Sequence, residues 1–423
     1  MRVTEIYIVI YFVLSPFIET KAQLKVDVEL RPRFEYRHGF SNLFSDGEDP
    51  AAFVSQRTRV NTEYKSEKIN LFLSIQDLRV WGDVPQLNRR DINGFSLHQA
   101  WAELILDASF SIKLGRQEVI YDDSRIFGNV NWAQQGRSHD LALIKFKKEE
   151  LRIESGFGFN QNNESLTGTV LTVPNNYKAI QYLWLHRDWS NFKASFLFLN
   201  HGVQFIDLVD SSNTDTRYSQ TAGTHLIYDK DKFELLSNLY YQFGKDVNAN
   251  DLNAYLLSLN ANYRLSKTWN VGLGIELISG NGEAFISNGS NDAFNPFFGT
   301  NHKFNGLMDY FFVGNHINNV GLLDLNAKAN LNLDMVSSGI IAIHNFSAEA
   351  NIPGNNSKQL ASEIDIVYSR KINKDATLNL GYSHLFETNG LEVLQNNSDG
   401  NTNNWAWIML TIKPTLFETE QVL

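Results

Sequence analysis

The feature that most constrains this chain is a period-two alternation of apolar and polar residues, which recurs from Leu24 almost to the C-terminus. In a β-strand, successive side chains point to opposite faces, so each alternating segment has one apolar and one polar face. The clearest segment, 268–278, carries the apolar stripe Trp269, Val271, Leu273, Ile275 and Leu277. Similar stripes lie in 233–243, 253–265 and 360–371, and helical spacing is hard to find in this part of the chain. The sequence therefore predicts an all-β protein.

The breaks between the stripes are of two lengths. Short breaks read as tight turns, at 66–68, 229–231, 266–267 and 373–375. Long breaks rich in Asn, Gly, Ser and Asp cover 40–52, 81–93, 118–135, 160–176, 202–215, 280–305 and 389–404. Short turns at one end and long loops at the other are typical of a transmembrane β-barrel of the outer membrane.

The stripes number roughly 18, an even count that suits an antiparallel barrel, and closure leaves no strand edge exposed to lipid. A soluble β-sandwich is the alternative, but a sandwich of this length normally divides into two or three domains. No linker or shift in composition interrupts the chain. We therefore expect one outer-membrane barrel domain over 23–423.

The first 22 residues differ from the rest of the chain. Arg2 precedes an apolar run over 6–14, and Ala22 follows Thr20 and Lys21. A basic start, a short apolar run and a small residue before the cleavage position are the parts of a secretory signal peptide. We expect residues 1–22 to be this leader and the mature protein to begin near Gln23.

The composition excludes several classes of protein. The chain has no cysteine, so it is not a disulfide scaffold, and its 43% of hydrophobic residues argue against disorder. A formal net charge of −10 and the lack of a dense basic run argue against a nucleic-acid partner. A helical membrane bundle would need repeated long apolar runs, which the chain after residue 22 lacks.

A barrel of this size encloses water, so its polar face decides its function. Three segments carry more charged residues than contact with water in the lumen requires: 74–81, 113–118 and 122–140. Charges facing lipid cost about 2–4 kcal/mol at the bilayer midplane, so we expect these to face the lumen or the loops. Paired with one another, they either rigidify the wall or present Arg forks, which recognise carboxylates. For the set as a whole we favour a charged constriction that passes an anionic solute.

The segments 76–82, 114–117 and 123–128, with Trp132, Arg137 and Asp140, resemble the signature of the alginate export family, the 18-stranded porins of the outer membrane. The stretch 297–306 with Asp309, Tyr310 and Phe311, and the last strand, are also similar to that family. The resemblance implies an anion-selective pore that passes a polyuronate in a Gram-negative outer membrane. Carried over by motif, the pore-lining candidates are Asp77, Arg79, Arg116, Arg125, Arg137 and Asp140. This sequence departs from the family at His139, where a Phe is common.

The partners implied are outer-membrane lipid, an anionic saccharide or similar solute, and the barrel assembly machinery, which commonly reads a terminal aromatic. Here the nearest aromatic to the C-terminus is Phe417. We expect no cofactor and no metal, although calcium at 46–49 or at Asp122 and Asp123 is conceivable.

Two alternatives to a channel remain. The first is a lipid-modifying hydrolase, which needs a Ser/His pair with an orienting group; histidines are present, but the G-x-S-x-G motif is absent. The second is a non-conducting binding or adhesin barrel, whose loop over 280–305 folds inward as a plug or outward as a surface. We favour the channel and expect no enzymatic activity.

Overall fold

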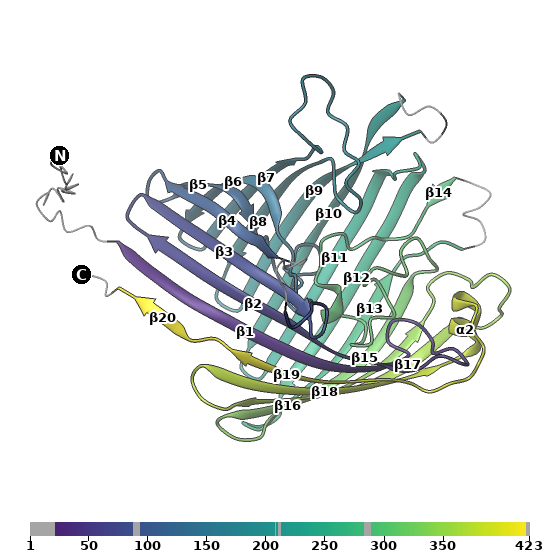
Figure 1. The fold of residues 1–423 in the computed structure, drawn as a ribbon. Helices are drawn as coiled ribbons and strands as arrows, with labels where there is room; N and C mark the ends of the chain where they lie inside the picture. Colours follow the sequence, from purple (N-terminus) through teal and green to yellow (C-terminus); the bar gives the residue numbers. More distant parts are fainter. Residues whose placement is uncertain (1–21, 88–93, 208, 210–212, 283–288, 420–423) are drawn as a thin grey trace, which may run out of the picture.

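A computed structural model describes residues 22–87, 94–207, 209, 213–282 and 289–419. Eighteen long strands form one closed antiparallel barrel, with both ends of the described chain at the same rim (Figure 1). The expected leader, residues 1–22, lies almost entirely outside the described residues.

The strands of the first half are β1 Gln23–His38, β2 Ala51–Lys65, β3 Ile69–Val80, β4 Phe95–Ile105, β5 Phe110–Gln117, β6 His139–Lys148, β7 Leu151–Phe159, β8 Ala179–Asp188 and β9 Phe192–Ile206. Those of the second half are β10 Thr214–Lys230, β11 Phe233–Lys245, β12 Asp251–Arg264, β13 Trp269–Ile278, β15 Leu322–Asn332, β16 Ser337–Ser347, β17 Gln359–Lys371, β18 Ala376–Glu387 and β19 Asn403–Ile412. Shorter elements are β14 Ser290–Asn291, the 3-10 turn η1 Asn301–Lys303, helix α2 Asn389–Gln395 and β20 Thr415–Glu418. Among the described residues, no helix is long and apolar enough to cross a membrane.

Closure comes from the pairing of the first and last long strands. Strand β1 pairs with β2 along its whole length and with β19 from Leu30 to His38. The start of β1 pairs with β20, which continues the line of β19 after Pro414. Every long strand therefore has a hydrogen-bonded neighbour on both sides, which is the condition for spanning lipid without an unsatisfied edge.

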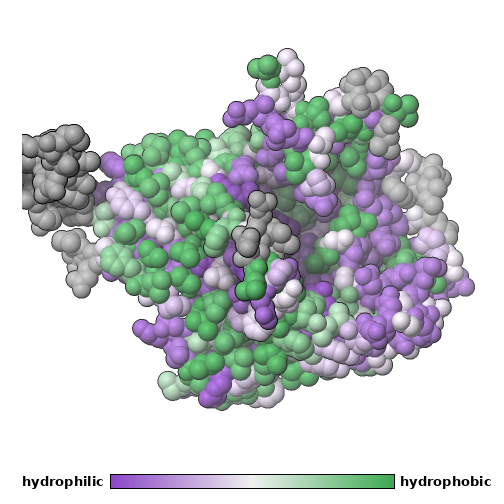
Figure 2. All heavy atoms as spheres, viewed as in Figure 1, coloured by the Kyte–Doolittle hydropathy of each residue, from purple (hydrophilic) through white to green (hydrophobic). Residues whose placement is uncertain are grey.

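The two faces of the sheet agree with the alternation in the sequence. The stripe on β13 faces outward, with Leu273 70% exposed, whereas Glu276 on the opposite face is buried. The stripes of β11 and β12 also point outward, and Leu239, Leu257 and Leu259 are exposed there. Figure 2 shows hydrophobic residues gathered over the strand wall and hydrophilic residues gathered toward the loops. The predicted all-β barrel and its outer face are confirmed.

The predicted difference between the two ends of the barrel is confirmed too. One rim carries only short connections, of which the longest are 106–109, 265–268, 333–336 and 372–375. We call this rim the turn end. The other rim, the loop end, carries all the long connections, and β9 and β10 reach further into the predicted break at 202–215 than the sequence indicates.

Two of the long loops fold into the barrel instead of away from it. The first, 118–138, joins β5 to β6, and the second, 279–321, joins β13 to β15. Many of their apolar residues are buried within the lumen, among them Tyr121, Ile126, Phe127, Phe294, Met308, Tyr310, Phe311 and Phe312. The described part of the loop that the sequence left undecided therefore acts as an inward plug.

The outer face can be tested by placing a charge on either side of one strand. Leu259→Arg puts a guanidinium on the lipid face of β12, whereas Asn260→Arg puts it on the lumen face. We expect L259R to lose about 2–4 kcal/mol of folding free energy and N260R to lose less than about 1 kcal/mol. Denaturant titration of the protein in lipid vesicles measures both, and equal losses would contradict the assignment of the faces.

Candidate functional site in the barrel lumen

The two inward loops are joined to each other across the lumen. Phe127 and Phe298 form an isolated parallel β-bridge, with a hydrogen bond of 2.9 Å from the Gly128 amide to the Phe298 carbonyl. The Arg137 guanidinium donates to the Gly299 carbonyl at 3.0 Å, and Lys303 Nζ donates to the Asp123 carbonyl at 2.8 Å. The loops therefore form one body inside the barrel, which we call the loop barrier.

Buried polar contacts fix the loop barrier to strands β13 and β17 of the barrel wall. Arg125, whose side chain is fully buried, forms an ion pair with Glu276 of β13 and donates to Asn305 Oδ1 at 3.1 Å. Glu363 of β17 accepts the Leu307 amide at 2.6 Å and the Met308 amide at 2.9 Å.

Glycine is needed at the turn before these amides. Gly306 has φ +83°, and a Cβ there would lie 2.5 Å from a Glu363 carboxylate oxygen. Any other residue would push away the carboxylate that holds the second loop.

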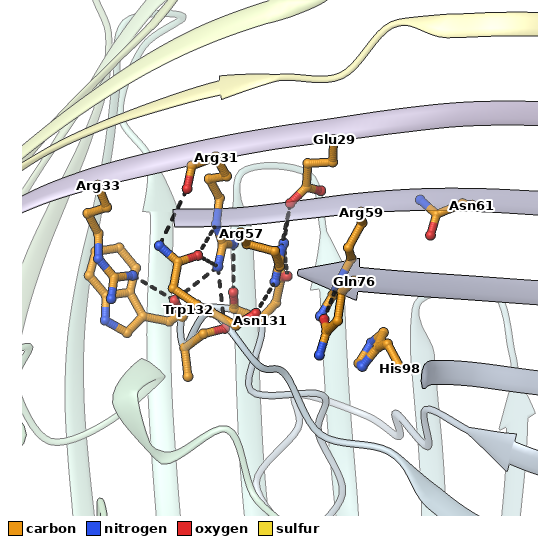
Figure 3. A network of polar contacts seen from close by, with 12 residues as sticks. Glu29, Arg31, Arg33, Arg57, Arg59, Asn61, Gln76, His98, Asn131 and Trp132 are labelled. Carbon is orange, nitrogen blue, oxygen red and sulfur yellow. Dashed lines mark hydrogen bonds and ion pairs between the residues drawn. The ribbon is translucent and has the colours of Figure 1, made fainter. Parts of the chain in front are cut away.

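Strands β1 and β2 hold the loop barrier through a row of arginines (Figure 3). We call this set the arginine row, and it consists of Arg31, Arg33, Arg57 and Arg59. Arg31 donates to the Asn131 carbonyl at 2.8 Å and to Gln134 Oε1 at 2.8 Å. Arg33 donates to the Trp132 carbonyl at 2.6 Å, and Arg59 to the Gln135 carbonyl at 3.1 Å.

Carboxylates balance the arginine row only in part. Arg57 is paired with Glu29, while Glu35 is shared between Arg33 and Arg37 at 2.8 Å each. Backbone carbonyls and the side-chain amide oxygens of Gln76, Asn131 and Gln134 accept the remaining hydrogen bonds, and they carry no net charge. The row therefore keeps an excess of positive charge that faces the lumen.

An aromatic cluster stands beside the row. The Trp132 ring stacks on His302 at 4.6 Å between centroids, and the Arg33 guanidinium lies 4.0 Å from its centroid. Trp405 and Trp407 of β19 meet the same indole edge-on. Trp132 is thus packed against His302, Arg33, Trp405 and Trp407.

Two cavities adjoin this cluster, one on each side. The loop-side cavity, about 490 Å³, lies against the ends of β1, β2 and β3 next to the loops and includes Arg33, Glu35 and Arg37. The turn-side cavity, about 620 Å³, lies against the turn-end halves of β12, β13, β15, β16 and β17. Trp132 is the one residue that lines both. Trp132 therefore borders both cavities.

Burial changes the proton affinity of the loop residues at this site. Burial lowers the pKa of Arg137 to about 10, because the low-dielectric surroundings disfavour its charged form. Burial raises the pKa of Glu118, but hydrogen bonds from His98 and Asn129 outweigh this effect, and the pKa lies below its usual value. Both groups are charged at neutral pH.

The structure brings two of the six residues predicted for the pore into the lumen. Arg125 and Arg137 both lie in the loop barrier, where Arg125 links it to β13 and Arg137 links its two loops to each other. Their guanidiniums hold parts of the protein together, which leaves little of either exposed to solvent in the lumen.

The other four share the parity of outward-facing residues of their strands, and their role in the pore stays a prediction. In the β2–β3 register, Gln76 and Leu78 stand opposite Arg59 and Arg57 of the arginine row, so Asp77 and Arg79 occupy the opposite face. They share that face with the exposed Leu73 and Ile75, although Arg79 still borders the loop-side cavity at its rim. The two form a bidentate pair at 2.6 and 2.7 Å.

Arg116 and Asp140 stand opposite each other and form an ion pair at 2.8 Å. They share their face with the exposed Leu114 and Ile144, and the Asp140 side chain is 60% exposed. Both pairs sit at the loop ends of their strands, where a charge on the outer face is close to water and costs far less than at the midplane.

The six residues predicted for the pore did not include the arginine row. A signal for it exists in the sequence, because Glu29, Arg31, Arg33, Glu35 and Arg37 follow one another at period two. Apolar residues alternate with them, so strand geometry alone assigns these charges to the inner face.

One cluster has the residue types of a hydrolase. His186 Nδ1 lies 2.8 Å from Ser195 Oγ, and His186 Nε2 lies 3.2 Å from Asp188. However, Ser195 is 3% exposed and its hydroxyl donates to Asp122 at 2.5 Å, so a substrate cannot reach it. Among the described residues, no group of three His, Asp or Glu side chains is placed to hold a metal ion.

The sequence matches the family model described as "Alginate export" over residues 22–157 and 200–405. No curated protein matches at a significant level. Solved structures with a similar fold include OccAB4 of Acinetobacter baumannii, with 13% identity, a TM-score of 0.63, and coverage of 95% of this chain and 100% of that one. They also include OccK5 (OpdH) of Pseudomonas aeruginosa, with 10% identity, a TM-score of 0.61, and coverage of 93% and 98%. OccK11 (OpdR) of Pseudomonas aeruginosa has 12% identity, a TM-score of 0.58, and coverage of 93% and 96%.

The Arg125–Glu276 pair gives a stability prediction. Arg125→Gln leaves Glu276 buried without its cation, which we expect to cost about 3–5 kcal/mol. The double variant R125Q/E276Q removes the stranded charge and should recover part of that loss. Denaturant unfolding in detergent measures both, with R152Q, at the half-exposed Arg152–Asp188 pair, as a control that costs less than about 1 kcal/mol. A double variant no more stable than R125Q would contradict the assignment.

The arginine row gives a prediction about local mobility. Arg31→Gln removes the hydrogen bonds from the guanidinium to 131–134, each worth about 1.5–3 kcal/mol for a charged donor. Amides over 129–137 should then exchange with deuterium at least about tenfold faster, while amides of β10 and β11 keep their rates. Arg264→Gln, at an exposed turn-end ion pair, is the control. Unchanged exchange over 129–137 would show that the row does not hold the loop.

Proposed function

The chain belongs to the alginate export family, and we propose on this basis that it is an outer-membrane channel for anionic saccharides or other small anionic solutes. The porin-like barrel and the family support a channel rather than an enzyme. The nature of the solute is the part that we infer from the lumen.

One observation carries this inference. Five arginines on β1 and β2, which are the arginine row and Arg37, share two carboxylates, Glu29 and Glu35. This local excess of positive charge stands in a protein whose net charge is −10. Fixed charge of one sign in a narrow, low-dielectric passage raises the concentration of the opposite ion.

The route that we propose runs from the loop-side cavity past Trp132 to the turn-side cavity. Arg33 and Arg37 line the first cavity together with carboxylates such as Glu35, so an entering anion meets these two guanidiniums before it reaches the aromatic cluster. We also propose that residues 1–22 are removed as a leader and that the barrel domain over 23–423 is the mature protein.

Planar bilayers test the channel and its selectivity together. We expect discrete conductance steps and a reversal potential in a KCl gradient that indicates anion preference. Arg33→Gln with Arg37→Gln should lower the anion-to-cation permeability ratio by about twofold or more, because it removes two of the three arginines that line the loop-side cavity.

The matched control is Lys267→Gln with Lys374→Gln, which removes two exposed cations from turns outside the lumen. This variant should keep the selectivity of the unmodified protein. Absence of conductance steps would refute the channel, and cation preference in the unmodified protein would refute the anionic solute.

A further inference from the structure

A groove of about 590 Å³ lies on the outer face of the wall, over β11, β12, β13, β15 and β16, which run side by side (Figure 1). In this groove the small residues Ala327 and Ala329 of β15 stand between the larger Leu273 of β13 and Ile341 of β16. The exposed Leu325 has the same parity as the two alanines, so the groove faces lipid. Most of the residues that border it are apolar.

Aromatic side chains mark the depth of the groove in the membrane. Trp269 pairs with Leu331 in the register, Leu331 with Gly339, and Gly339 with Tyr368, so the two aromatics stand at one level near the turn end. Trp and Tyr on the outside of a barrel prefer the level of the lipid headgroups. Ala329 is two residues further from the turn end than Leu331, so the groove lies at the depth of the acyl chains. Short turns face the periplasm, which places the groove in the periplasmic leaflet.

A glycine leaves the wall open between the groove and the rim. Gly339 pairs with Leu331 on one side, and a Cβ on it would have no atom nearer than the Val367 carbonyl oxygen at 3.7 Å. The space beside Leu331 is therefore unfilled. The next residue of the same parity on β16 is Ser337, so a lipid chain in the groove can reach this serine without crossing a side chain of β16.

Polar side chains meet at Ser337. The Tyr368 hydroxyl donates to Ser337 Oγ at 3.2 Å, and the Arg370 guanidinium donates to the same oxygen at 3.0 Å. Asp334 lies 3.9 Å from Arg370, while its other oxygen accepts the Val336 and Ser337 amides at 2.7 Å each. The Arg370 side chain is 50% exposed, so its five-donor fork keeps a face that a phosphate can approach.

The rim beside the groove carries more basic than acidic residues. The stretches 264–268, 333–337 and 370–375 contain Arg264, Lys267, Arg370, Lys371 and Lys374 against Asp334 and Asp375. The adjoining stretch 229–232 adds two residues of each sign, and its Asp229 pairs with Arg264. This local excess of positive charge complements an anionic headgroup.

We propose that the groove and Arg370 form a binding site for one anionic glycerophospholipid of the periplasmic leaflet. One acyl chain lies on Ala327 and Ala329 and passes Gly339, and the phosphate accepts hydrogen bonds from the Arg370 guanidinium. The site is on the lipid face of the barrel, so it goes beyond the proposed channel and does not depend on the solute.

Native mass spectrometry of the full-length protein, titrated in detergent with dioleoyl-phosphatidylglycerol, tests this site. We expect one lipid to bind saturably. Arg370→Gln should weaken its binding about fivefold or more, because it removes the cation that meets the phosphate. Ala329→Leu should weaken it about tenfold or more, because the larger side chain fills the groove. Affinities equal to that of the unmodified protein would overturn the proposal.

Each variant has a matched control. Lys68→Gln removes an exposed cation from the β2–β3 turn, at the same rim but away from the groove. Ala194→Leu enlarges an alanine of β9 that has the parity of the exposed Phe192 and Phe196 and lies outside the groove. Both controls should bind the lipid as the unmodified protein does. An equal loss in a variant and its control would mean that lipid coats the whole wall, which overturns a defined site.

Two further outcomes identify the occupant. Dioleoyl-phosphatidylethanolamine, whose headgroup has no net charge, should bind at least about threefold more weakly, and equal binding would overturn the preference for an anionic lipid. A protein dimer that Ala329→Leu dissociates would assign the groove to a second copy of the chain and overturn the lipid site. Circular dichroism of each variant confirms that a lost affinity does not come from unfolding.

Discussion

The closed ladder of backbone hydrogen bonds is the constraint on which the rest of this structure depends. In lipid, an unpaired amide or carbonyl costs several kcal/mol, and the β1–β19 pairing removes the last free edge. Once the ladder closes, the period of two assigns every side chain to lipid or to the lumen. The absence of cysteine is consistent with this arrangement, because the sheet itself joins the two ends of the chain.

Closure creates a second problem, because a wide lumen has to be made selective. Here two loops fill it, and their backbone groups need partners away from bulk water. The arginine row supplies donors from one wall, and Glu363 supplies an acceptor from the other. The loop barrier is therefore set by the wall, and the position of Trp132 between the two cavities follows from it.

The sequence predicted the strand number, the faces of the stripes and the rim that carries the loops, because these follow from local alternation and composition. Asp77 and Arg79 were expected at the pore, although the same pattern gives them the other parity. They continue the parity of Leu71, Leu73 and Ile75, so strict alternation assigns them to the outer face. Arg116 likewise continues the parity of Leu114.

The contacts across the lumen could not be predicted from the alternation of apolar and polar residues. Arg125 and Glu276 are 151 residues apart, and nothing in the residues around either one specifies the other. The sequence also left open whether the second loop folds inward, because that outcome depends on Glu363 and on the apolar pocket formed by several strands. Such information lies in tertiary packing, which period and spacing do not encode.

The two kinds of cation in the lumen fit two different tasks. A guanidinium offers five donors in a rigid fork, which suits the carbonyls and amide of 131–135, whose positions do not change. An ammonium on a flexible stem adapts to a ligand that arrives and leaves, and weaker, adjustable contacts favour passage over permanent retention. Arg31 and Arg33 therefore hold the loop barrier, while Lys303 and Lys328 line the turn-side cavity.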